Sequence, residues 1–177
     1  MALIDLIEES VVRAPLKASD KNSALRELVE TLATAGKILE VETAYQAVVD
    51  REAKGSTGLS EGIAVPHAKT LAARELTVAI GVSPDGIDFG SIDDKPARLF
   101  FLILAPPDKA GPHIEALAEI ARMSRSKAFC ASLAACRSPV EARASRRRVA
   151  LEPQAPGTRS DRLQRNRTHG HSARRGM

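Results

Sequence analysis

Two side chains that could act as nucleophiles lie seven residues apart in the stretch Gly55-Ser-Thr-Gly-Leu-Ser-Glu-Gly-Ile-Ala-Val-Pro-His67. Ser60 is the centre of Gly58-Leu-Ser-Glu-Gly62, which fits the G-x-S-x-G pattern around the nucleophile of serine hydrolases. His67 follows a short apolar run and a proline. The residues around each of them decide which is the better candidate for chemistry.

A serine hydrolase would need an acid, a base and a particular local fold. Asp93 or Asp94 and then His113 follow the serine in the Ser–Asp–His chain order of α/β-hydrolases. The hydrolase elbow also requires a buried strand directly before the serine. Here residues 50–57 form a charged helix end and a loop, and the predicted strand begins only at Ile63. We therefore treat a hydrolase as a remote alternative and the serine as an ordinary loop residue.

His67 has a stiffer setting. Pro66 has a fixed φ and also restricts Val65, so the imidazole follows a rigid corner at the end of the predicted strand 63–65. Ligands of α/β sheets bind at the ends of strands. A single histidine is more often structural than functional, so the assignment depends on convergent partners.

Two further side chains could complete an anion site around this imidazole. Gly111-Pro112 predicts a helix with proline at its first position, which places His113 at about the second. Free N–H groups and the helix dipole would favour an anion there. Arg51, where a predicted helix ends, could hold phosphate oxygens as a bidentate donor. The alternative for this arginine is a surface ion pair with Asp50 or Glu52.

The sequence predicts no cofactor and no metal. His169 and His171 lie in a basic tail, no H-E-x-x-H motif is present, and residues 55–58 lack the Lys-Ser/Thr ending of a P-loop. Cys130 and Cys136 are six residues apart in a predicted helix and therefore on different faces. That spacing indicates neither a redox pair nor a zinc site.

The elements that must position these residues alternate between helix and strand. Residues 97–104 form a continuous apolar run, typical of a strand covered on both faces. The order predicts an α/β fold with one mixed sheet flanked by helices on both faces. Further helices are predicted over 20–36, 42–53 and 126–135, and two more begin at 111 and at 138. In the helix from 111, the residues expected to face inward are Ile114, Leu117, Ala118 and Ile120. Further strands are predicted over 63–65, 76–83 and 87–89, with a turn at 84–86 between the last two.

Length and composition predict one cytoplasmic domain with an unusual C-terminus. The chain has 177 residues, no apolar run long enough to span a membrane and no basic N-terminal signal. Its net charge of +4 is unevenly divided, because residues 143–177 hold ten arginines against Glu152 and Asp161. That local charge of +8 leaves residues 1–142 at −4. We predict a domain over 1–142 and an Arg-rich, disordered tail over 143–177.

Three stretches, in this order, resemble the fructose/mannitol-type (type 2) enzyme IIA domains of the bacterial phosphoenolpyruvate-dependent sugar phosphotransferase system. They are residues 50–67 with the Val-Pro-His ending, residues 94–106, and residues 113–121. The resemblance covers roughly residues 2–142. It implies a mixed sheet flanked by helices and a phosphotransferase component that forms a phosphohistidine intermediate.

The resemblance also implies roles for particular residues and partners. His67 would be the phosphorylated residue, with His113 and Arg51 as its neighbours. Phospho-HPr would be the donor and an enzyme IIB domain for a fructose/mannitol-type sugar the acceptor, so the membrane is met only indirectly through the sugar permease. The family includes a nitrogen-regulatory branch whose members signal, and this is the alternative function. No cofactor is implied, since the phosphate arrives and leaves on histidine.

The chain departs from the family pattern in two places. Ser60 stands where the family usually has Gly or Ala, a small change in an exposed loop. Family domains normally finish with a packed amphipathic helix, whereas here the capping box at 138–141 leads into Arg-rich sequence. A frameshift in a GC-rich gene would generate such a composition, and a basic arm for an acidic partner is the alternative. Nucleic acid is disfavoured as its partner, because residues 143–177 contain no Phe, Tyr or Trp for stacking.

Overall fold

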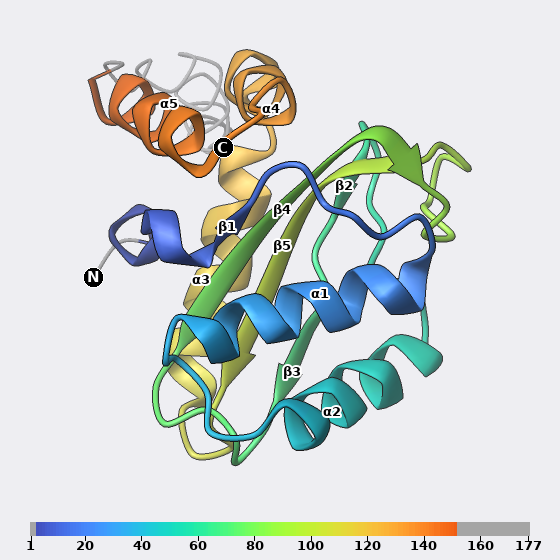
Figure 1. Ribbon diagram of the computed structural model, residues 1–177, viewed down its shortest axis with the longest axis vertical. Coiled ribbons are helices and arrows are strands. Elements are labelled where there is room, and N and C mark those ends of the chain that lie inside the picture. The colour runs from blue at the N-terminus through green and yellow to red at the C-terminus, as the bar shows by residue number, and fades with distance from the viewer. Residues whose placement is uncertain (1–2, 152–177) are drawn as a thin grey trace, which may run out of the picture.

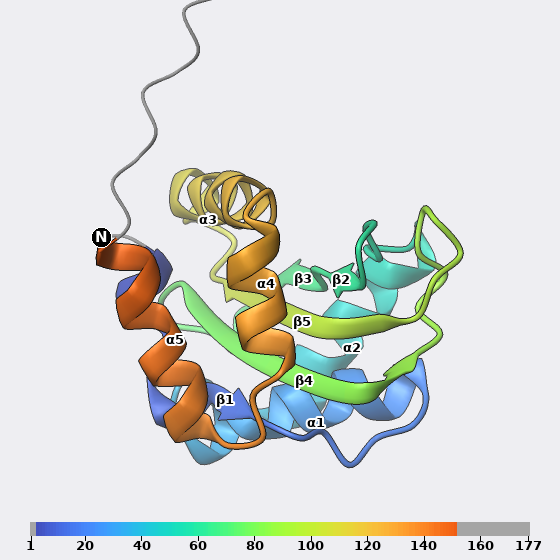
Figure 2. The same ribbon diagram turned by 90° about the horizontal axis from the view of Figure 1, so that it is seen from above.

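The computed structural model describes residues 3–151, which form one mixed sheet between two layers of helices (Figure 1). Helices α1 and α2 cover one face, and α3, α4 and α5 lie on the other side, as the view from above shows (Figure 2). The α/β fold predicted from the sequence is therefore confirmed. In chain order the elements are η1 (Leu3–Leu6), η2 (Glu9–Val11), β1 (Val12–Arg13), α1 (Lys21–Thr34), α2 (Val41–Ala53), β2 (Ile63–Ala64), β3 (His67–Lys69), β4 (Thr77–Ile87), β5 (Ala97–Ala105), α3 (Ala110–Met123), α4 (Lys127–Ala134) and α5 (Pro139–Leu151).

Strand β5 is the centre of the sheet and of the core. It pairs antiparallel with β4 on one side and parallel with β2 and β3 on the other, and β1 extends the sheet beyond β4. Alternate side chains of β5 are buried on opposite faces, which explains its continuous apolar run. Phe100, Leu102 and Leu104 pack with α1 and α2, and Leu99, Phe101 and Ile103 pack with α3 and α4.

The first two helices agree with their sequence signals. The Asp20 carboxylate accepts the Ser23 N–H at 3.0 Å and caps α1, an interaction that typically contributes about 1 kcal/mol. Gly36, with φ +71°, follows the end of that helix. Helix α2 ends at Ala53, directly before the loop that leads to β2. The chain thus brings Arg51, in the last turn of α2, toward the strand that carries His67.

Strand β4 is longer than predicted. The turn expected at Pro84-Asp-Gly86 does not reverse the chain, because the strand continues to Ile87, which pairs with Ala97. The register shifts between Val82 and Ile87, so the extra residues form a bulge. Gly86 adopts φ +80°, a conformation that glycine reaches without a steric penalty. The separate short strand predicted over 87–89 is therefore wrong.

Helix α3 differs from the prediction in its start and in its inward face. It begins at Ala110 and not at Pro112. Ile114 and Ala118, predicted to face inward, are exposed, whereas Ile120 is buried as expected. Relative to the prediction, the helix is turned about its axis, so that the row of side chains that includes His113 and Ala116 packs against the sheet. The histidine in that row is polar, so the row did not stand out as apolar in the sequence.

Helix α5 extends past the predicted domain end. Irregular chain was expected from residue 143, but the structure continues the helix through Leu151. Arginine and alanine favour helices, and neither Gly nor Pro occurs between Val140 and Glu152. The rest of the predicted tail, 152–177, lies outside the described residues, so its disorder stays a prediction. Within residues 3–151, no helix is both long enough and apolar enough to cross a membrane.

Candidate functional site

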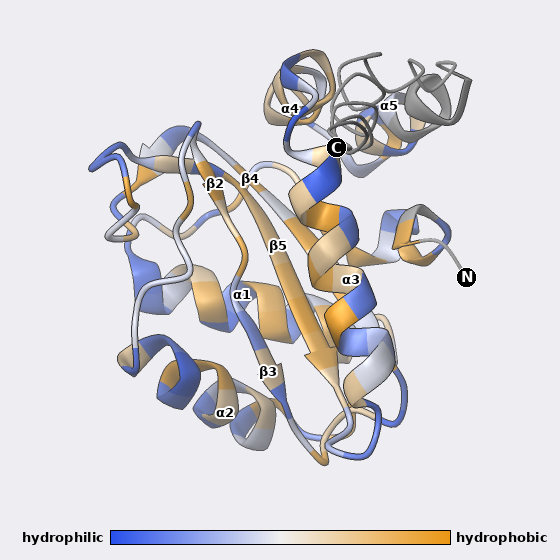
Figure 3. Cartoon of the chain, turned by 180° about the vertical axis from the view of Figure 1, so that it is seen from behind, coloured by the Kyte–Doolittle hydropathy of each residue, from blue (hydrophilic) through white to orange (hydrophobic). Residues whose placement is uncertain are grey.

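The two histidines predicted as site residues face each other. The ring centroids of His67 and His113 are 5.5 Å apart, and the ring planes are tilted by 52°. His67 is the first residue of β3, which lies between α2 and α3 in the view from behind (Figure 3). Strand β3 was not predicted, because it has only three residues and ends in an exposed lysine. Its parallel pairing with β5, in which His67 is opposite Ile103, fixes the position of the histidine within the sheet.

One open cavity of about 490 Å³ contains all three predicted site residues. His67 comes from β3, His113 from α3 and Arg51 from α2, so three separate elements converge on this space. The remaining lining residues are Ala47, Asp50, Lys54, Ala68 and Lys69. Three basic side chains against one carboxylate give the cavity a positive balance that suits an anion.

A backbone contact sets the proton position on His67. Its Nδ1 atom is 2.9 Å from the carbonyl oxygen of Val65. A carbonyl oxygen only accepts hydrogen bonds, so the contact assigns a proton to Nδ1. In the neutral ring Nε2 then keeps its lone pair. The rigid Pro66 between the two partners holds them at this separation.

His113 is held by burial. The side chain is 6% exposed, and its Nε2 atom has no hydrogen-bond partner within residues 3–151. Burial lowers the pKa of His113, and the charges of His67 and Lys69 lower it further. The ring is therefore neutral at pH 7. A buried polar atom without a partner costs free energy, and a bound oxyanion would give it one.

The predicted place of His113 in its helix was wrong in detail. It is the fourth residue of α3, and its own N–H points to the carbonyl oxygen of Lys109 at 3.4 Å. The backbone of His113 is thus part of the helix and supplies no free N–H donor. The imidazole is the group of this residue that the site can use.

Arg51 has a weaker local attachment than an ion pair. Its Nη1 donates to the carbonyl oxygen of Gly55 at 3.1 Å, within the loop that follows α2. The surface ion pair considered from the sequence is not among the contacts of residues 3–151: Asp50 accepts a hydrogen bond from Gln46, and Glu52 is buried against Lys21. The guanidinium therefore has donors left for a ligand.

Two lysines of the cavity were missed in the sequence. Lys69 is two residues beyond His67 in β3 and so lies on the same side of the strand. Lys54 is three residues beyond Arg51, where α2 ends. Both spacings were visible, but the first has meaning only for a strand, and that strand was not predicted.

The structure contradicts the hydrolase alternative. Ser60 is exposed in a loop, and no strand ends at it, because β2 starts three residues later. The carboxylate of Asp93 accepts the backbone N–H of Glu61 at 3.1 Å. His113, the candidate base, faces His67. Ser60 thus lacks the strand that a nucleophile elbow requires.

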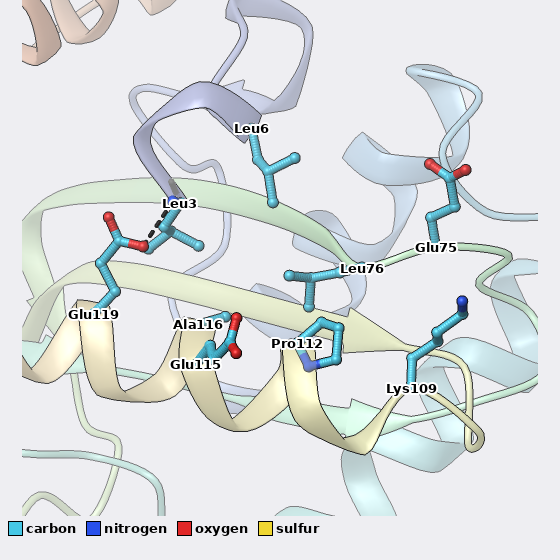
Figure 4. A pocket seen from close by; sticks show the side chains of 9 residues that line it. All are labelled: Leu3, Leu6, Glu75, Leu76, Lys109, Pro112, Glu115, Ala116 and Glu119. Carbon is cyan, nitrogen blue, oxygen red and sulfur yellow. Dashed lines mark hydrogen bonds between the residues drawn. The ribbon is translucent and has the colours of Figure 1, made fainter. Parts of the chain in front are cut away.

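A second cavity, of about 440 Å³, lies between η1 and α3 and contains neither histidine (Figure 4). Leu6, Leu76 and Ala116 form part of its apolar wall. The Glu119 carboxylate accepts the Leu3 N–H at 2.7 Å beside it. Within residues 3–151 no group of three or more His, Cys, Asp or Glu side chains could hold a metal ion. The histidine cavity is therefore the site with convergent chemistry.

The chain belongs to a known family. Residues 5–145 match the family model described as "Phosphoenolpyruvate-dependent sugar phosphotransferase system, EIIA 2". The "PTS system fructose-specific EIIABC component" of Bacillus subtilis is 34% identical over 123 residues, which are 70% of this chain and 19% of that protein. The match thus spans about a fifth of that relative's length, so its activity as a whole does not transfer to this chain.

Solved structures from both branches of the family share the fold. The nitrogen regulatory protein IIA-Ntr from Neisseria meningitidis has a TM-score of 0.74 and 26% identity, over 81% of this chain and 98% of that one. The complex of enzyme IIAMTL with phosphorylated enzyme IIBMTL from Escherichia coli matches with a TM-score of 0.66 and 28% identity, over 78% of this chain and 94% of that one. The protein is therefore a IIA domain of the type 2 class.

Proposed function

We propose that the protein is a phosphocarrier in which Nε2 of His67 accepts a phosphoryl group from phospho-HPr and passes it to an enzyme IIB domain. The observation that carries the proposal is the contact between His67 Nδ1 and the Val65 carbonyl oxygen. It leaves Nε2 as the nucleophilic nitrogen of a ring that lines a basic cavity.

The transfer consists of two displacements at phosphorus. In the first, the Nε2 lone pair of His67 attacks, the P–Nε2 bond forms, and the bond from phosphorus to the donor nitrogen breaks. The donor keeps that electron pair. The proton stays on Nδ1 of His67, so the positive charge that develops on the ring is stabilised by the Val65 carbonyl oxygen. In the second displacement a nucleophile of the acceptor attacks phosphorus and the P–Nε2 bond breaks.

The other side chains of the cavity stabilise the phosphoryl oxygens. Arg51 offers two parallel N–H donors, and Lys54 and Lys69 add positive charge. His113 is neutral, and its Nε2 can donate to an oxygen when that nitrogen carries the proton. Phosphoryl transfer depends mainly on such positioning and charge stabilisation. The site provides both from side chains alone.

The comparisons support two destinations for the phosphate. The fructose-specific relative and the mannitol IIA–IIB complex favour sugar uptake with a IIB acceptor. The Neisseria nitrogen regulatory structure, which is matched over 98% of its own length, favours control of a partner by phosphorylation state. Both use the same phosphohistidine in our proposal, and the partner separates them.

The test is incubation with enzyme I, HPr and phosphoenolpyruvate, followed by mapping of an acid-labile phosphate. We expect phosphate on His67 in the wild type and none in His67→Ala, with Ser60→Ala as a matched loop control that is labelled normally. Phosphate that persists in His67→Ala would overturn the proposal. Chase of the labelled protein with fructose- and mannitol-type IIB domains then distinguishes the branches: transfer supports uptake, and retention of the label supports the regulatory alternative.

A further inference from the structure

Glu52 is the buried carboxylate nearest in sequence to the site, and the phosphocarrier chemistry does not use it directly. It lies in the last turn of α2, beside Arg51, and is 8% exposed. From the sequence it was only a possible surface partner for that arginine. The structure instead turns its side chain inward, away from solvent.

The carboxylate of Glu52 binds groups from two segments. Oε1 accepts from the ammonium of Lys21, the first residue of α1, at 2.7 Å, and from the backbone N–H of Thr57 at 2.9 Å. Oε2 accepts from the Thr57 hydroxyl at 2.6 Å. Lys21 is held in turn over the Phe89 ring, with Nζ 4.6 Å from its centroid. Both oxygens of the buried carboxylate are therefore hydrogen-bonded, as a buried charge requires.

These bonds fix the charge on Glu52. Burial alone would raise its pKa, but the hydrogen bonds from Lys21 and from the side chain and backbone of Thr57 outweigh burial, and the net shift is downward. Glu52 is therefore ionised at neutral pH, with Lys21 as its counter-ion. A carboxylate with three charge-assisted contacts is a rigid anchor for the residue it binds.

Thr57 connects this anchor to the catalytic histidine. Its carbonyl oxygen accepts the N–H of Val65 at 3.0 Å, and the carbonyl oxygen of Val65 is 2.9 Å from Nδ1 of His67. Thr57 and Val65 are both buried, so water does not compete for these bonds. The position of the Val65 carbonyl therefore depends on where Glu52 holds Thr57.

We infer that Glu52, with Lys21, is a positioning residue: through Thr57 and Val65 it holds the carbonyl oxygen that keeps the proton of His67 on Nδ1 and Nε2 free for phosphorus. The inference rests on the proposed role of His67 for its consequence in catalysis. The orientation and tautomer of the ring do not depend on that role and can be measured without any partner protein.

The first measurement is ¹⁵N NMR of the neutral His67 imidazole. We expect the wild type to show the Nδ1–H tautomer and Glu52→Ala to shift toward the Nε2–H tautomer that a free histidine side chain favours. Glu52→Gln, which can still accept the Thr57 N–H, should shift less. The matched control is Glu42→Ala, because Glu42 is an exposed carboxylate of the same helix, paired with Arg26 at 2.6 Å. It should leave the His67 spectrum unchanged.

The second measurement is the rate of phosphate transfer from phospho-HPr. Misplacement of a reacting group lowers the rate steeply, so we expect kcat to fall about tenfold to a hundredfold in Glu52→Ala. KM for phospho-HPr should stay near the wild-type value, because Glu52 lies beneath the surface. If Glu52→Ala does not fold, the same two measurements are made on Glu52→Gln and Thr57→Val, because both substitutions preserve side-chain volume.

The outcomes separate this inference from the proposed function. A folded Glu52 variant with the wild-type His67 spectrum and kcat overturns the positioning role, whatever the wild type does with phosphate. A wild type that accepts no phosphate, combined with a shifted spectrum in Glu52→Ala, overturns the phosphocarrier proposal and supports the positioning role. An equal shift in Glu42→Ala would show a general effect of α2 and would also overturn the inference.

Discussion

His67 and His113 lie with their ring centroids 5.5 Å apart, but the regions that hold them use different physical means. In the β3 region His67 is half-buried, and its ring is oriented by a hydrogen bond to the carbonyl oxygen of Val65 across Pro66. The α3 region buries His113 against the sheet and leaves its Nε2 without a partner within residues 3–151. In our proposal the first arrangement makes His67 the nucleophile, and the second makes His113 a neutral group that a bound phosphoryl oxygen can satisfy. Variants at each ring test this difference.

The largest effect is expected at His67. His67→Ala removes the nucleophilic nitrogen, so phosphate incorporation should fall to background in the enzyme I and HPr assay. The thermal midpoint should change little, because the ring is half-buried and makes one hydrogen bond. A large decrease in the midpoint temperature of thermal unfolding in this variant would mean that the His67 ring is mainly structural.

The next largest effect is expected at His113. In His113→Phe the ring volume is kept but the buried nitrogen is lost, so the transfer rate should fall about a hundredfold while phosphate still reaches His67. Single-turnover labelling measures the rate. If His113→Phe incorporated as little phosphate as His67→Ala, the proposed division between nucleophile and stabilising group would be wrong.

A smaller effect is expected at Arg51. Arg51→Ala removes a bidentate donor from the cavity and should slow transfer about tenfold, and Arg51→Lys should recover only part of the rate, because an ammonium is not a fork-shaped donor. Arg26→Ala is a suitable control, since Arg26 pairs with Glu42 on the surface. Equal rates for Arg51→Ala and the wild type would remove Arg51 from the site.

The smallest effect concerns stability against pH. The pKa of His113 is lowered in the folded protein, chiefly by burial, so well above pH 6.5 neither the folded nor the unfolded state binds a proton there. As the pH falls below 6.5 the unfolded state takes up a proton that the folded state refuses, and the free energy of unfolding decreases until the folded pKa is reached. Urea melts between pH 7 and pH 5 should show a shallower decrease in His113→Phe. Identical pH profiles would contradict the burial argument.

The sequence was most informative where a local pattern has one physical solution. The apolar run 97–104 is typical of a strand covered on both faces, and β5 is such a strand. The helix predicted over 20–36 corresponds to α1, which Asp20 caps and Gly36 follows. The sequence was least informative for short or polar pieces: β3 has three residues, and helix α3 buries a row that contains His113. Strand β3 is too short to show a period, and the histidine in the buried row of α3 gives no apolar signal.

The chain by itself determined which residues could take part in the site: the Val-Pro-His corner, a second histidine and an arginine that ends a helix. Tertiary structure alone decided that these three meet in one cavity and that Lys54 and Lys69 join them. It also decided that Glu52 turns inward to Lys21 and Thr57 and leaves Arg51 available for a ligand. The physical reason is that burial, proton position and hydrogen-bond partners depend on segments distant in sequence, and only the packed sheet brings those segments together.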